Sequence, residues 1–162
     1  GGRRRSGRKM KIVLEIPEAS PSKNQLLRHH WGHGVRTQAH WDKLVREALQ
    51  IWLYELPDGK DSLPVALLQE RMKAFRPAGK RRVTVIRQAP RLLEELNFLG
   101  GLAPVIDALR LRRNRKSMDF KGTHLILDDS EAMMENGPHR QVKGPKGTVI
   151  IVENVENRED AL

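Results

Sequence analysis

The sequence contains no cysteine, which excludes disulfide cross-links, thiolate metal sites and cysteine nucleophiles. No apolar run approaches the roughly 20 residues of a membrane-spanning helix. The N-terminal arginines precede no apolar segment, so we expect neither a membrane protein nor a secretory signal. Glycine-rich nucleotide-binding motifs are also missing, so we expect no small-molecule cofactor. Aromatic residues make up only 4% of the 162 residues, but the hydrophobic 38% suffices for one globular domain.

Positive charge is the most prominent feature that is present. Thirty lysines and arginines stand against twenty acidic residues, which leaves a formal net charge of +10. A protein this basic commonly binds a polyanion, and nucleic acid is the commonest one. A solvated basic surface or a basic tail is the alternative explanation of the charge, and a ribosome-associated protein is a further alternative.

The pattern of apolar residues predicts one domain over residues 10–153. Residues 1–9 contain no apolar side chain and are expected to form a disordered basic arm, and residues 154–162 a frayed tail. Alternating or continuous apolar residues predict strands over five segments: 11–16, 63–75, 82–88, 123–127 and 148–153. We expect the second and third of these strands to form an antiparallel pair.

Two segments show helical spacing instead. Apolar residues on one helical face predict a helix from Thr37 or His40 to Tyr54, with Trp41 and Trp52 in the core. A second amphipathic helix is expected over 102–109, with Pro104 in its first turn. The expected fold class is α/β (α+β), with two helices packed on a small mixed β-sheet.

Two pairs of carboxylates suit a divalent metal ion. Glu94 and Glu95 precede the second helix, and Asp128 and Asp129 close a predicted strand. Mg²⁺ takes oxygen ligands and is commonly held by one or two carboxylates plus phosphate. In a basic protein this arrangement predicts phosphodiester hydrolysis with Mg²⁺, or with Mn²⁺ in its place. Solvated turn charges or helix caps are the alternative interpretation of these acidic residues.

Basic residues gather in several segments that could contact DNA phosphates. Residues 23–36 are expected to form a loop with two glycines and the histidines His29, His30 and His33. We favour a DNA-contacting loop over a zinc site there. Trp31 either stacks at a branch point or packs on the sheet. The candidate DNA-contacting residues are Lys23, Asn24, Arg28, His29, Arg36, Arg81, Arg82, Arg112, Arg113, Arg115 and Lys116.

Three short motifs occur in a recognisable order. They are Pro21-Ser22-Lys23-Asn24 after the first strand, then residues 94–109 with Asn97, two glycines and Asp107-Ala108-Leu109, and finally Asp128-Asp129-Ser130. In these motifs the chain resembles the RusA family of Holliday junction resolvases and their phage-encoded relatives. The resemblance spans residues 11–153. It implies a homodimeric, Mg²⁺-dependent endonuclease that cuts four-way DNA junctions, and a cytoplasmic, nucleoid-associated protein of bacterial or phage origin.

The chain departs from the family pattern at two catalytic positions. The family's two acidic ligands fall on Glu94 and Leu96, and its lysine falls on Ala103. Glu95 would face away from Glu94 on an extended segment. We therefore expect a protein that binds branched DNA and, if active, holds Mg²⁺ with Glu94, Glu95, Asp128 and Asp129. The alternative is a catalytically impaired DNA-binding or interaction protein.

Overall fold

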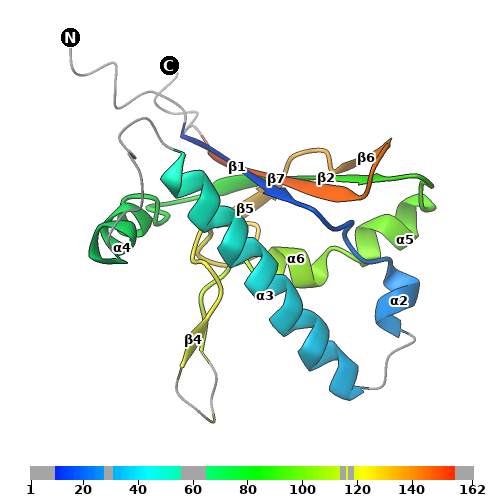
Figure 1. Ribbon diagram of the computed structural model, residues 1–162, viewed down its shortest axis with the longest axis horizontal. Coiled ribbons are helices and arrows are strands. Elements are labelled where there is room, and N and C mark those ends of the chain that lie inside the picture. Colours follow the sequence, from blue (N-terminus) through cyan, green and yellow to red (C-terminus); the bar gives the residue numbers. More distant parts are fainter. Residues whose placement is uncertain (1–9, 28–30, 56–64, 114–115, 117–118, 156–162) are drawn as a thin grey trace.

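The computed structural model describes residues 10–27, 31–55, 65–113, 116 and 119–155, with the backbone alone described for 31–35 and 65–69. It confirms the predicted mixture of helices with a mixed sheet (Figure 1). In the sheet, β1 (Lys11–Ile16) pairs antiparallel with β7 (Gly147–Asn154), and β7 pairs antiparallel with β2 (Arg81–Ala89). The other side of β2 pairs in parallel with β5 (Met134–Asn136) and then with β6 (Arg140–Lys143).

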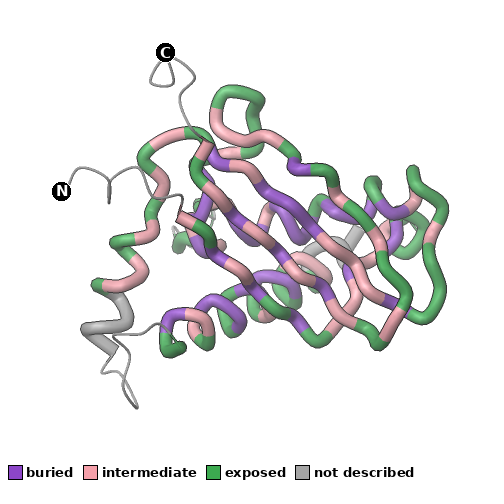
Figure 2. The backbone as a smooth tube through the Cα atoms, turned by 90° about the horizontal axis from the view of Figure 1, so that it is seen from above, coloured by how far each residue is buried: buried purple, intermediate pink, exposed green. Residues whose placement is uncertain are grey.

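One face of the sheet forms the core because its strands alternate. Two rows of directly paired residues cross the three long strands, and all six side chains are buried. The rows are Ile12–Val152–Val83 and Leu14–Ile150–Val85. Figure 2 shows how buried positions alternate with less buried ones along these strands. Helix α3 (Trp31–Tyr54) packs against β1 and supplies Trp41, Val45 and Leu49 to the same core.

The long helix was predicted correctly from its apolar face, but it begins earlier than expected. Most of the predicted loop over 23–36 is wrong, because α2 (Lys23–Leu27) and the first turns of α3 occupy it. No proline lies between Pro21 and Pro57, and a glycine within a helix costs only about 1 kcal/mol relative to alanine. The apolar face of α3 packs on the sheet, and this packing outweighs that cost. Trp41 is buried, whereas Trp52 is half-buried and packs edge-on against Phe75.

The strand predicted over 63–75 is wrong. Its central part is α4 (Val65–Ala74), which consists almost entirely of strong helix formers, with Val65 as the single β-branched residue. The predicted pairing of this segment with β2 is therefore wrong as well. The antiparallel partner of β2 is β7, which begins more than 50 residues after β2 ends.

The part of the chain between β2 and β5 supplies elements that lie beneath the sheet (Figure 1). Its elements there are α5 (Glu95–Gly100), α6 (Ala103–Asp107) and a two-stranded ribbon of β3 (Arg112–Arg113) and β4 (Phe120–Lys121). The predicted helix over 102–109 is confirmed in a shorter form, and its Pro104, Val105 and Ile106 are buried. The strand predicted over 123–127 is reduced to one bridge between Arg110 and Ile126.

Two residues beyond the expected domain end at residue 153 contact the domain. The Asn154 side chain accepts a hydrogen bond from Arg81 Nε at 3.0 Å, and the Val155 N–H donates to the Lys80 carbonyl at 3.1 Å. The predicted arm over 1–9 and the rest of the predicted tail lie outside the described residues. Among the helices of the described part, none is both long and apolar enough to cross a membrane.

Candidate nucleic-acid interface

The first two motif segments pack directly on one another. The Asn24 N–H donates to Asn97 Oδ1 at 2.9 Å, which joins α2 to α5. Gly101 ends α5 at a point where a Cβ atom would lie 1.8 Å from the Pro21 carbonyl oxygen. Only glycine allows the two backbones to approach so closely. Residues more than 70 positions apart in the chain are therefore held side by side.

The third motif segment lies against the end of the second. The Leu125 and Ile126 N–H groups both donate to the Leu109 carbonyl, at 2.8 and 3.2 Å. Arg110 then forms ion pairs with Asp107 (Nη2 to Oδ1, 2.9 Å) and with Asp129 (Nη1 to Oδ1, 3.8 Å). The guanidinium thus lies between one carboxylate from each segment, and the three motif segments form one continuous strip.

The fold changes the titration of Asp128 in this strip. Hydrogen bonds from Ser130, including its N–H to Asp128 Oδ1 at 2.8 Å, lower the pKa of Asp128. The positive charge of Arg110 adds to this effect. Asp128 is therefore ionised at neutral pH.

The four predicted metal ligands do not form a site within the described part of one chain. In that part no three acidic or histidine side chains come close enough to hold a metal ion. Glu94 is the exposed N-cap residue of α5, and Glu95 lies exposed in its first turn. Leu96 is 69% exposed where the resemblance implies a carboxylate. In the described residues Asp129 pairs with Arg110, and the two glutamates lie on α5, so the four carboxylates are not grouped around one point.

A basic groove lies between α3 and the β3–β4 ribbon. It has a volume of about 600 Å³. The cations that line the groove are Lys43 and Arg46 from α3, with Arg112 and Lys121 from the ribbon. Lys43, Arg46 and Lys121 are exposed. Figure 1 shows the ribbon extending below the sheet beside α3, so the two elements form opposite walls.

The two walls are braced by a network of polar contacts. Arg112 forms an ion pair with the buried Asp42 of α3, and its Nε donates to the Asp107 carbonyl at 3.0 Å. Gln38 Nε2 donates to Asp42 Oδ1 at 3.1 Å and to the Pro104 carbonyl at 2.9 Å. This network continues through Asp107 to Arg110 and Asp129. The groove is therefore rigidly connected to the strip of motif segments.

Arg81 does not belong among the DNA-contacting residues. It is 3% exposed, and its guanidinium donates to the Phe75 and Leu125 carbonyls, each at 2.6 Å. Burial lowers the pKa of Arg81 to about 10. With its donors directed at backbone carbonyls and at Asn154, Arg81 cannot reach a phosphate. It joins the start of β2 to the chain around it and has a structural role.

The other predicted DNA-contacting residues fall into three groups. Lys23, Asn24 and Arg36 lie exposed on α2 and α3. Arg82 pairs with Glu135 at 3.2 Å, and the half-buried Arg112 pairs with Asp42. Arg113 and Lys116 belong to the ribbon and its connection and are exposed.

Some of these predictions fall on parts of the chain that the structure leaves undescribed. Arg28, His29, His30 and Arg115 lie outside the described residues, as do the side chains of Trp31 and His33. The proposed roles of the histidine cluster and of Trp31 therefore stay predictions.

The sequence analysis missed Lys43, Arg46 and Lys121. These residues are separated along the chain, so no basic cluster marks them. A usable signal was present in α3, where Gln38 and Asp42 lie four residues apart and Lys43 and Arg46 three apart, on neighbouring parts of one helix surface.

Comparisons of the chain with protein-family models, with curated proteins and with solved structures find no match.

Proposed function

We propose that this protein binds double-stranded DNA, including branched DNA, through phosphate contacts in the groove between α3 and the β3–β4 ribbon. One observation carries the proposal. Lys43, Arg46 and Lys121 line the groove, are exposed, and have no ion-pair partner among the described residues. The nearby Asp42 is already paired with Arg112.

Unpaired cations on opposite walls of a groove suit a polyanionic backbone. Each phosphate that a lysine or arginine neutralises releases condensed counterions, which supplies affinity without regard to base sequence. Such contacts position a duplex and leave its sequence unread. The net charge of +10 acts in the same direction by attracting DNA from a distance. A protein of this kind would act at the nucleoid.

Salt dependence of binding tests this proposal. We expect fluorescence anisotropy with labelled linear duplex and four-way junction, measured in EDTA, to show affinity that falls linearly with the logarithm of salt concentration. Contacts to three phosphates in the groove alone give a slope of about −2.7. Affinity that does not change with salt, or no binding at low salt, would contradict the proposal.

Endonuclease activity is the second candidate function. The observation that favours it is the contact between all three segments in which the chain resembles the RusA family. Among the described residues no three acidic or histidine side chains are grouped so that they could hold a metal ion, so we expect a labelled four-way junction to be bound but left intact in Mg²⁺ or Mn²⁺. Metal-dependent cutting by the wild type that Asp129→Asn abolishes would favour the endonuclease instead. Cutting gained only in the double variant Leu96→Asp with Ala103→Lys would show that Leu96 and Ala103 are what inactivates the endonuclease in the wild type.

We also propose that two copies pair through the outer edge of β1. In the described part of the chain no strand covers this edge, and the 57% exposed Ile51 of α3 lies beside it. A two-fold antiparallel pair centred on Val13 places Lys11 of each copy opposite Glu15 of the other. Both side chains are exposed, so two cross-strand ion pairs would stabilise this register.

A charge exchange tests the dimer. Light scattering should give a dimer mass for the wild type, a weakened dimer for Lys11→Glu, and a restored one for Lys11→Glu with Glu15→Lys. A monomeric wild type would contradict the pairing, as would a single variant that dimerises unchanged.

A further inference from the structure

The β3–β4 ribbon has two chemically different faces. Its cross-strand pairs are Arg112 with Lys121 and Arg113 with Phe120. Because side chains alternate along a strand, the two pairs point to opposite sides. Arg112 and Lys121 line the basic groove, so Arg113 and Phe120 lie on the outer face of the ribbon.

Phe120 is exposed to an unusual degree for an aromatic residue. Its exposed fraction is 62%, whereas the other described Phe and Trp side chains are buried or half-buried. Phe120 is not among the residues that form or contact the hydrophobic core. Its ring is therefore available for a contact outside the chain.

Arg113 prepares the ring for stacking. Its guanidinium carbon lies 5.9 Å from the centroid of the Phe120 ring, within the range of a cation–π contact. This contact restrains the ring and places a positive charge beside it, while the high exposure of Phe120 leaves ring surface open to solvent. An aromatic ring next to an arginine is the combination on which unpaired nucleobases stack.

We propose that the outer face of the ribbon binds an unpaired nucleobase at a DNA branch point by stacking on Phe120. This inference rests on the proposed function, because the groove face of the same ribbon would hold duplex phosphates. The ribbon then lies between a paired arm on its Arg112 and Lys121 side and an unstacked base on its Phe120 side. Branched DNA offers both at once, whereas a linear duplex would have to unstack a base first.

Paired changes in protein and DNA isolate the stacking contact. Two four-way junctions are compared. The first has one unpaired adenine at the branch point, and the second is identical except for an abasic nucleotide at that position. Anisotropy in EDTA measures their binding to the wild type, to Phe120→Leu and to Phe120→Tyr. Leu111→Ala serves as a control that removes an exposed apolar side chain beside the ribbon. Melting temperatures verify that all variants are folded.

The expected result is a loss of about tenfold in wild-type affinity when the adenine is replaced by the abasic nucleotide. Phe120→Leu should bind both junctions equally, and Phe120→Tyr and Leu111→Ala should keep the difference. Equal discrimination by the wild type and Phe120→Leu would overturn the inference while leaving groove binding intact. A wild type that binds neither junction would overturn the proposed function, and this inference with it.

Discussion

Replacing Gly101 by alanine should destabilise the fold by opening the contact between the first two motif segments. The backbone of Gly101 has φ −88° and ψ −3°, a conformation that any residue adopts, so the substitution introduces no backbone strain. The obstacle is space. The new Cβ would lie 1.8 Å from the Pro21 carbonyl oxygen and 2.8 Å from the Ser22 carbonyl carbon, whereas ordinary contact begins near 3.4 Å.

The two backbones must therefore separate by about 1.6 Å, since no flexible side chain can move aside to accommodate the methyl group. Overpacking of this kind typically costs 1–3 kcal/mol, and a backbone-on-backbone clash belongs at the upper end, at about 3 kcal/mol. For a domain of this size that corresponds to a fall in melting temperature of about 6–12 °C. Thermal unfolding followed by circular dichroism measures it.

Gly79→Ala is the matched control. A Cβ at Gly79 would have no atom within 4 Å, so this variant should melt at the wild-type temperature or slightly above it. Gly101→Ala with the stability of Gly79→Ala would refute the close approach of Pro21 to Gly101. The argued contact between the motif segments would then be wrong.

Two further predictions concern buried polar groups. Arg81→Met should lower the free energy of unfolding by about 3 kcal/mol or more, because it leaves the Phe75 and Leu125 carbonyls without their donor. The control Arg82→Met removes only a partly exposed ion pair and should lower it by less than about 1 kcal/mol. Equal urea midpoints for the two variants would contradict this prediction. His139 accepts the Val85 N–H on Nδ1 at 2.9 Å, and burial lowers the pKa of His139. The unfolded chain therefore takes up the proton first, and stability should fall as the pH drops below about 6.5. His139→Asn should reduce this fall in melts between pH 7.5 and 5.5, and an unchanged pH dependence would count against it.

The sequence was most informative where one strong pattern covered a long element. Alternation located β1, β2 and β7, and a helical apolar face located α3, because each of these elements buries one continuous row of side chains. The short strands β5 and β6 escaped prediction. Their residues are all half-buried or exposed, and the two strands exist through backbone pairing with β2.

The error over residues 63–75 has a similar physical basis. A short apolar run fits both a strand and a helix, and only the helix-forming residues that follow Val65 favour α4. The groove was harder still to predict from the sequence. Lys43 and Lys121 lie almost 80 positions apart in the sequence, and only the folded chain brings them to one groove. Conversely, Arg81 looked like part of a basic cluster, and its burial follows from contacts with distant segments.

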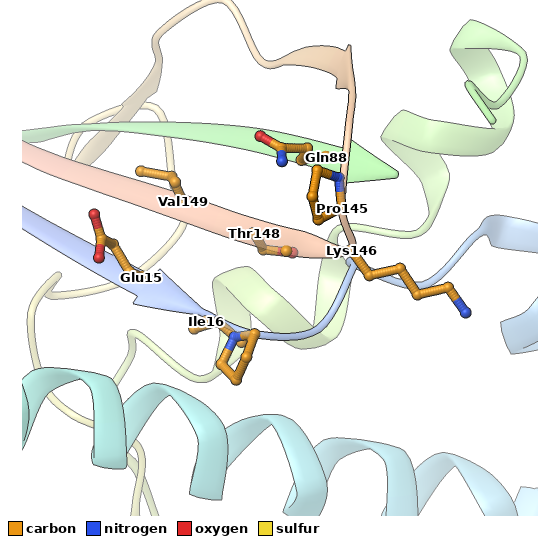
Figure 3. A pocket seen from close by; sticks show the side chains of 9 residues that line it. Glu15, Ile16, Gln88, Pro145, Lys146, Thr148 and Val149 are labelled. Atoms are coloured by element: carbon orange, nitrogen blue, oxygen red, sulfur yellow. The ribbon is translucent and has the colours of Figure 1, made fainter. Parts of the chain in front are cut away.

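The most direct test of the groove compares two triple variants that remove the same charge. One is Lys43→Gln, Arg46→Gln and Lys121→Gln in the groove; the other is Arg140→Gln, Lys143→Gln and Lys146→Gln. The control residues are exposed on β6, which pairs with β2, and on its turn to β7, and Figure 3 shows Lys146 extending away from the strands.

The measurement is the slope of the logarithm of the DNA association constant against the logarithm of salt concentration, for the wild type and both variants. The groove variant should lose about 2.7 of the wild-type slope, because three phosphate contacts disappear, whereas the control should keep most of it. Equal losses in the two variants would show that net charge alone drives binding and would contradict a DNA interface in the groove.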